Sequence, residues 1–163
     1  MNTARDILTA FVTAFDRHDP DGIAALYAPD AAIRWPDTAE GIDLAAVRAA
    51  YRRWFTAIPD ARMQVRSGVA EGRQAVAEVV ITGTNTGRLT LSDIDRAVLA
   101  TPAEALPPTG RTLILPVAVA IDISDGLVAS ERSYFSSLGL PLQPGLLGHA
   151  PGDDQHMASG RTE

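Results

Sequence analysis

The spacing of apolar residues changes once along the chain, near Arg62, from a helical period to a strand period. Before that point apolar residues mostly recur every three or four positions, which is typical of amphipathic helices. The predicted helices span residues 3–16, 21–27 and 43–57. The predicted strands span residues 31–35, 62–70, 75–82, 112–123 and 127–135. Helices first and strands afterwards favour an α+β fold, with the helices on one side of a curved, mainly antiparallel sheet.

Capping and turn residues support these boundaries. Thr3 and Asp43 are suited to cap the first and third helices, because their side-chain oxygens can accept hydrogen bonds from free N–H groups of the first turn. Gly72 and the pair Asp125-Gly126 are typical of hairpin turns between neighbouring strands. Residues 92–110 form an insertion between strands, with a possible helical turn. Such insertions are often lids or binding loops, and the alternative is a surface loop without a role in binding.

The bulk properties indicate one domain and exclude several classes of function. A chain of 163 residues can bury a hydrophobic core large enough to fold without disulfides or metal ions. We expect a domain over residues 1–145 followed by a flexible tail over 146–163. The absence of cysteine fits a reducing cytoplasm and removes thiol chemistry. A net charge of −6 argues against nucleic acid as a partner. No stretch approaches the length of a membrane span, so we expect no membrane contact.

Several short motifs, taken in order, resemble those of the SnoaL-like polyketide cyclases, a branch of the nuclear-transport-factor-two-like superfamily. They are His18-Asp19-Pro20-Asp21-Gly22-Ile23, Leu26-Tyr27-Ala28-Pro29-Asp30-Ala31, Trp54-Phe55-Thr56-Ala57-Ile58-Pro59-Asp60, Gly83-Thr84-Asn85-Thr86-Gly87, Pro108-Thr109-Gly110-Arg111, Asp125-Gly126 and Arg132-Ser133-Tyr134-Phe135. The resemblance implies a cone-shaped sheet with three helices around one apolar pocket. It also implies a homodimer, and chemistry without a cofactor on a small hydrophobic substrate.

The chain departs from the family pattern at two positions. Asn85 stands where the family commonly has histidine after Gly-Thr, and Ser136 stands where cyclases place an aspartate after an aromatic pair in the last strand. In the similar cyclases that aspartate is the general base of the ring-closing aldol step. Another acid is therefore needed if this chain performs the same chemistry.

Two acids are candidates for that base. Glu78 has apolar neighbours on both sides, and burial there would raise its pKa toward the range useful for proton transfer. Asp122 would pair across the hairpin with Arg132, which would hold a carboxylate ionised to accept a proton or orient a water. Each has an alternative: for Glu78 it is a position facing solvent on a half-buried strand, and for Asp122 it is a surface salt bridge at the end of the hairpin.

The remaining candidate site residues are assigned from alternation and aromatic content. Counting alternate positions from Val128 gives one face of the last strand, and the resemblance suggests that this face lines the pocket. The candidates on that face that would hold substrate oxygens or transfer protons are Arg132, Tyr134 and Ser136. The candidates for contact with substrate are Phe15, Trp35, Tyr51, Trp54, Phe55, Met63 and Asn85. The three histidines do not converge, and the carboxylates lack the spacing of a metal loop, so no metal or other cofactor is expected.

Three hypotheses for function follow. The first is a cofactor-independent cyclase or isomerase that acts on a polyketide-like intermediate by general acid-base catalysis. The second is an epoxide hydrolase or epoxide-opening cyclase, because that chemistry uses a carboxylate-arginine arrangement like the one proposed for Asp122 and Arg132. The third is a binding protein without catalytic activity, which has lost the family aspartate.

Overall fold

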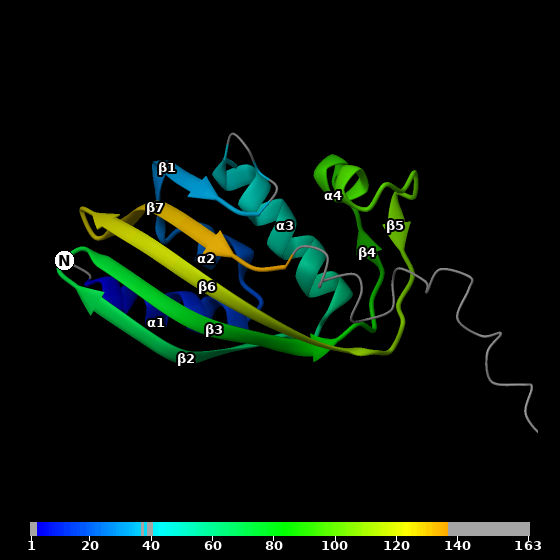
Figure 1. The fold of residues 1–163 in the computed structure, drawn as a ribbon, viewed down its shortest axis with the longest axis horizontal. Helices are drawn as coiled ribbons and strands as arrows, with labels where there is room; N and C mark the ends of the chain where they lie inside the picture. Colours follow the sequence, from blue (N-terminus) through cyan, green and yellow to red (C-terminus); the bar gives the residue numbers. More distant parts are fainter. Residues whose placement is uncertain (1–2, 37, 39–40, 137–163) are drawn as a thin grey trace, which may run out of the picture.

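Five strands form one curved sheet in the order β1-β7-β6-β3-β2 (Figure 1). The computed structural model describes residues 3–36, 38 and 41–136. The strands are β1 (Tyr27–Arg34), β2 (Arg62–Glu71), β3 (Gln74–Thr84), β6 (Thr112–Ser124) and β7 (Leu127–Tyr134). Strands β2, β3, β6 and β7 pair antiparallel with one another, as predicted, whereas β1 joins the edge parallel to β7. The sheet stays open, with β1 and β2 at its edges.

Three helices precede most of the sheet, as the apolar spacing predicts. They are α1 (Ala4–Asp16), α2 (Pro20–Ala24) and α3 (Leu44–Ala57). Thr3 and Asp6 form a capping box at the start of α1, and the Asp43 side chain accepts from the N–H of Ala46 at the start of α3. Helix α2 is shorter than predicted and β1 is longer, because the backbone becomes extended at Tyr27 rather than at Ala31.

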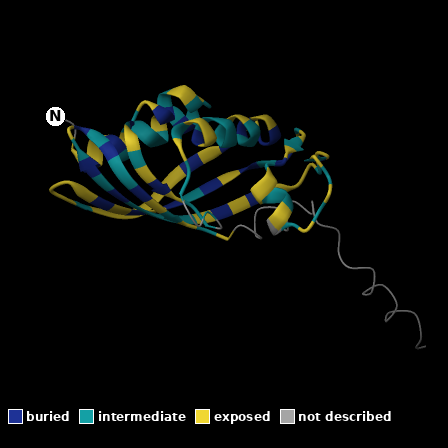
Figure 2. Ribbon diagram, turned by 90° about the horizontal axis from the view of Figure 1, so that it is seen from above, coloured by how far each residue is buried: buried dark blue, intermediate teal, exposed yellow. Residues whose placement is uncertain are grey.

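The main core lies between the helices and one face of the sheet. Alternate residues of β3 are buried and exposed in turn, which the banded strands of Figure 2 make visible. Phe15 of α1, Val47 of α3 and Leu113 of β6 are fully buried in this core. No helix of the described residues covers the opposite face of the sheet (Figure 2). The fold is therefore two layers, and any internal site has to form between the helices and the concave face of the sheet.

The insertion folds into a small unit of its own beyond the end of the main sheet (Figure 1). The unit begins earlier than the predicted residue 92: it consists of β4 (Leu89–Thr90), α4 (Asp93–Val98) and β5 (Ala105–Leu106), with β4 and β5 paired antiparallel. Ser92 and Asp95 form a capping box that fixes the start of α4. The helical turn predicted within the insertion is confirmed as α4. The tail expected over residues 146–163 lies outside the described residues, so it stays a prediction.

Candidate active site

A cavity of about 360 Å³ opens between the helices and the concave face of the sheet. Its wall is mostly apolar, and a volume of this size falls in the range of small-molecule sites. Aromatic side chains from α1, β1, α3 and the residues after them contribute much of the wall: Phe11, Phe15, Tyr27, Trp35, Tyr51 and Trp54. The strands add aliphatic side chains: Met63, Val65, Val79, Ile81, Leu115, Val117, Val119, Ile121 and Val128.

One carboxylate, Glu131 of β7, lies in this wall and is only 4% exposed. Its Oε1 accepts hydrogen bonds from Trp35 Nε1 at 2.9 Å and from Ser133 Oγ at 2.6 Å, and its Oε2 accepts from the Tyr27 hydroxyl. None of the ion pairs among the described residues includes Glu131. Neutral hydrogen-bond donors, rather than a cation, therefore stabilise the charge of this carboxylate in an apolar cavity.

A β-bulge explains why Glu131 faces inward. In the pairing with β6, Ile123 stands opposite Val128 and Asp122 opposite Ser130, so that Ala129 is an extra residue in β7. An extra residue shifts the alternation of side chains by one position. Beyond the bulge Glu131, Ser133 and Phe135 face the cavity.

The predicted face of the last strand is consequently wrong beyond the bulge. Counting alternate residues from Val128 places Arg132, Tyr134 and Ser136 inside, but none of the three lies in the cavity wall. The Tyr134 side chain is 61% exposed on the outer face. These three residues therefore cannot contact a molecule held in the cavity.

The two acids favoured by the sequence also lie on the outer face of the sheet. Glu78 is exposed and accepts a hydrogen bond from Ser67 Oγ at 3.1 Å. Asp122 accepts from Ser130 Oγ and from Gln74 Nε2, each at 2.6 Å, and lies 3.5 Å from the Arg132 guanidinium. The hydrogen bonds from Ser130 and Gln74, and then the Arg132 charge, lower the pKa of Asp122. Neither acid reaches the cavity, so the expectation of an inward base at Glu78 or Asp122 is corrected.

Asn85, predicted to contact substrate, is a structural residue instead. It is fully buried, and its amide nitrogen donates to the carbonyls of Ala57 and Gly87, at 3.2 and 3.0 Å. Its side-chain oxygen accepts from the backbone N–H and the hydroxyl of Thr109. Asn85 thus joins the end of α3 to the loops on both sides of the insertion, and it is not part of the cavity wall.

The aromatic candidates divide between the cavity and the core. Phe15, Trp35, Tyr51, Trp54 and Met63 lie in the cavity wall. Phe55 does not: it is buried between the rings of Phe15, Tyr51 and His18. Contact of the five wall residues with a substrate stays a prediction.

Sequence reasoning missed Glu131 and Tyr27. Glu131 lies in a polar run, Ser130 to Ser133, that looks like the exposed part of a hairpin. Counting backward from Phe135, an aromatic residue that prefers the interior, places Ser133 and Glu131 inside. Tyr27 was missed because it was assigned to the end of a helix, whereas it begins β1 with its ring buried.

Two tyrosines in the cavity wall differ in their hydrogen bonding. Tyr27 donates to Glu131, whereas the Tyr51 hydroxyl has no hydrogen-bond partner among the described residues. Burial, and then the negative charge of Glu131, raise the pKa of both tyrosines well above the usual value. Tyr51 therefore keeps its proton at neutral pH, and its O–H group is available to a bound molecule.

These raised pKa values predict alkaline destabilisation. Above about pH 10 the unfolded chain loses tyrosine protons that the folded protein keeps, so the free energy of unfolding falls as pH rises further. Each buried tyrosine adds up to about 1.4 kcal/mol per pH unit to this slope. The chain has no lysine to obscure the effect. Urea unfolding between pH 8 and pH 11 measures it.

Matched variants test the assignment of this slope. Tyr27→Phe is expected to flatten the alkaline loss of stability, because it removes one of the two buried phenols. Tyr134→Phe, which changes the exposed phenol, is expected to leave the slope unchanged. Equal slopes in the Tyr27 variant and the unmodified protein would contradict the assignment.

The described residues contain no group of three His, Asp or Glu side chains placed to hold a metal ion. Among the helices of the described part of the chain, none is long and apolar enough to cross a membrane.

Comparison with solved structures places this geometry in a known fold. The chain is similar to AclR, a candidate hydroxylase from Streptomyces galilaeus, at 20% identity over 90% of this chain and 83% of AclR, with a TM-score of 0.70. It is similar to TsrD from Streptomyces laurentii at 25% identity over 88% of this chain and 95% of TsrD, with a TM-score of 0.66. A SnoaL-like polyketide cyclase from Agrobacterium tumefaciens matches at 17% identity over 88% and 98% of the two chains, with a TM-score of 0.62.

The sequence itself also matches a family model, that of the SnoaL-like domain, over residues 8–131. No curated protein matches the chain. The family match covers most of the residues that build the sheet, the helices and the cavity, including Glu131. The chain belongs to the family of SnoaL-like domains.

Proposed function

We propose that the protein is a cofactor-independent enzyme of the cyclase or isomerase type, in which Glu131 is the general base. The observation that carries this proposal is a carboxylate without a cationic partner in the wall of an apolar cavity. Three neutral donors orient it. Polyketide cyclases among the similar structures agree with the reaction type.

Glu131 has room to accept a proton. A carboxylate has about four lone-pair directions, and the protein donors occupy two on Oε1 and one on Oε2. One direction on Oε2 stays open to a substrate. The Tyr27 and Trp35 hydrogen bonds fix the orientation of the carboxylate, so that it meets the substrate without rearranging.

The proposed reaction begins at an acidic C–H bond beside a carbonyl group. Glu131 takes the proton, the C–H electron pair forms a carbon-carbon double bond, and the carbonyl π electrons move to oxygen. Tyr51 donates a hydrogen bond to the resulting enolate, because its hydroxyl is protonated and has no partner among the described residues. In a ring closure the enolate carbon then attacks a second carbonyl of the same molecule. Glu131 returns its proton to the new alkoxide, so the product is an isomer of the substrate.

The epoxide-opening hypothesis required Asp122 and Arg132 in the cavity, but this pair lies on the outer face of the sheet. A binding protein without activity is the remaining alternative, and it would leave Glu131 with a structural role only.

A carbon acid of simple structure tests the proposed base. The protein is expected to accelerate the exchange of the C1 hydrogens of 2-tetralone for deuterium, with saturation as the ketone concentration rises, measured by proton NMR in deuterium oxide. Exchange no faster than with an equal concentration of bovine serum albumin would contradict the proposal.

We also propose that the protein forms a homodimer through the outer face of the sheet. Apolar side chains of four strands are exposed there, among them Val69, Val76, Ile114 and Tyr134. Val69 stands opposite Val76 in the pairing of β2 with β3, so these two side chains lie next to each other on that face. Large apolar side chains exposed on one face of a sheet are typical of a surface that another chain covers.

Light scattering after size-exclusion chromatography tests the dimer. A mass about twice the subunit mass of 17.2 kDa is expected. Val76→Arg is expected to give the subunit mass, because it places a charge in the proposed interface. Thr9→Arg, on the exposed side of α1, is the control and should stay dimeric. A dimer that survives Val76→Arg would contradict this surface.

A further inference from the structure

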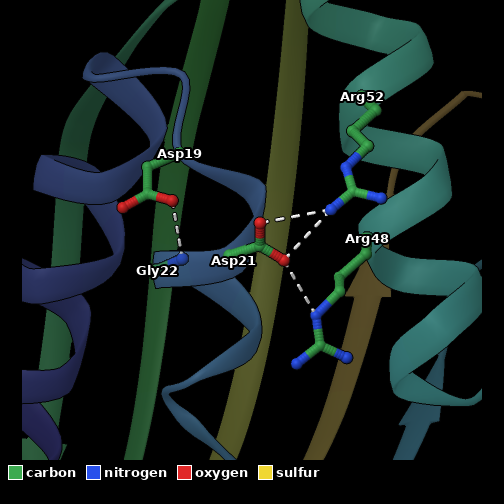
Figure 3. Close-up of polar contacts among 5 residues, drawn as sticks. All are labelled: Asp19, Asp21, Gly22, Arg48 and Arg52. Carbon is green, nitrogen blue, oxygen red and sulfur yellow. Dashed lines mark hydrogen bonds and ion pairs between the residues drawn. The ribbon is translucent and has the colours of Figure 1, made fainter.

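Arg53 differs from the two arginines near it on α3. Arg48 and Arg52 both bind the carboxylate of Asp21 on α2, at 3.2 and 3.1 Å, on the outside of the molecule (Figure 3). Arg53 instead lies in the wall of the cavity, and its side chain is 28% exposed. The three neighbouring arginines of α3 are therefore divided between two surfaces, and Arg53 belongs to the cavity.

The Arg53 guanidinium has unused hydrogen-bond donors. Its one ionic contact among the described residues is Asp95 Oδ2 on α4, at 3.9 Å, which is too long for a hydrogen bond. Asp95 Oδ2 already accepts from the backbone N–H and the hydroxyl of Ser92, each at 2.7 Å. Asp95 is thus held by the cap of α4, and the five N–H groups of Arg53 lack a protein acceptor in the described structure.

We propose that the Arg53 guanidinium forms a subsite for a carboxylate group of the substrate, in the part of the cavity bounded by α4. A carboxylate fits because a guanidinium binds it through two hydrogen bonds. The inference rests on the proposed function only in treating the bound molecule as the substrate. It adds that this molecule has an acidic C–H group for Glu131 and a carboxylate for Arg53, joined by an apolar body.

Two probes with the same apolar body test the subsite. They are 2-naphthylacetate and 2-(2-naphthyl)ethanol, whose dissociation constants are measured by isothermal titration calorimetry. The unmodified protein is expected to bind the carboxylate at least about tenfold more tightly than the alcohol, since a hydrogen bond to a charged group is worth roughly one factor of ten or more. Equal affinity for the two probes would overturn the proposal.

Variants on the same helix locate the effect. Arg53→Leu is expected to weaken binding of the carboxylate about tenfold, with little change for the alcohol. Arg52→Leu is the matched control, because it removes an equal charge one residue away from the subsite. Circular dichroism confirms that each variant folds. The subsite would be overturned if Arg53→Leu left carboxylate binding unchanged, or if Arg52→Leu weakened it equally. Neither result would bear on the role of Glu131, which the exchange of 2-tetralone measures separately.

Discussion

Replacing Glu131 by glutamine is expected to lower the rate of 2-tetralone exchange by about 10²–10⁴-fold, the usual contribution of a general base. Glutamine keeps the size of the side chain and one acceptor oxygen, but it cannot take a proton at neutral pH. The amide also cannot accept on both sides as the carboxylate does, so one of the three donors to Glu131 is left without its acceptor. Some loss of stability is therefore expected as well.

Two controls separate the chemistry from that loss of stability. Glu78→Gln and Asp122→Asn make the same change of charge on the outer face of the sheet, and both are expected to keep at least about half of the exchange rate. Ser133→Ala removes one donor to Glu131 and keeps the carboxylate, so it reports how far orientation alone affects the rate. An exchange rate in the Glu131→Gln protein equal to that of the unmodified protein would exclude this residue as the base.

Replacing Asn85 by alanine is expected to lower the free energy of unfolding by about 3 kcal/mol or more. After the change the Ala57 carbonyl keeps the Gly87 N–H as its donor, and the Thr109 N–H keeps the backbone carbonyl of residue 85 as its acceptor. The four hydrogen bonds that are lost are each worth about 0.5–1.5 kcal/mol. These costs do not add fully, because the loops can relax toward water. Urea unfolding at pH 7 measures the effect.

The neighbouring residue Thr86 provides the control for Asn85. It is exposed, so Thr86→Ala is expected to change the free energy of unfolding by no more than about 0.5 kcal/mol. If Asn85 contacted substrate instead, Asn85→Ala would weaken binding of the naphthalene probes and leave stability nearly unchanged. That pattern would contradict the structural role assigned to it.

The order of helices and strands could be predicted because the capping residues, the turn residues and the spacing of apolar residues all indicate the same elements. Thr3 and Asp43 cap helices whose apolar residues recur at helical spacing, and the long strands carry alternating or continuous apolar residues. The turn at Asp125-Gly126 has positive φ at both residues, as the pair suggests for a tight hairpin. The parallel position of β1 beside β7 could not be predicted, because it depends on contacts between residues about 100 positions apart.

The candidate site was predicted less well, and the cause is local. The alternation of side chains along a strand predicts which face each residue occupies only where the strand is regular. The extra residue Ala129 reverses that prediction for every later residue of β7. Bulges often re-aim a side chain next to a functional site, and here the bulge turns Glu131 into the cavity. The aromatic wall was easier to predict, because Phe15, Trp35 and Tyr51 lie in or beside helices and strands with a clear apolar face.

Glu131 and Tyr51 are expected to contact the two reacting parts of one substrate, the acidic C–H group and its carbonyl oxygen. A crystal structure of the complex with 2-naphthol, which has the shape of the enol of 2-tetralone, tests both contacts at once. We expect the naphthol oxygen at about 3 Å from the Tyr51 hydroxyl and the C1 atom at about 3–3.5 Å from Glu131 Oε2. A naphthol bound in the cavity with no atom near the Glu131 carboxylate, or bound only on the outer face of the sheet, would exclude Glu131 as the base.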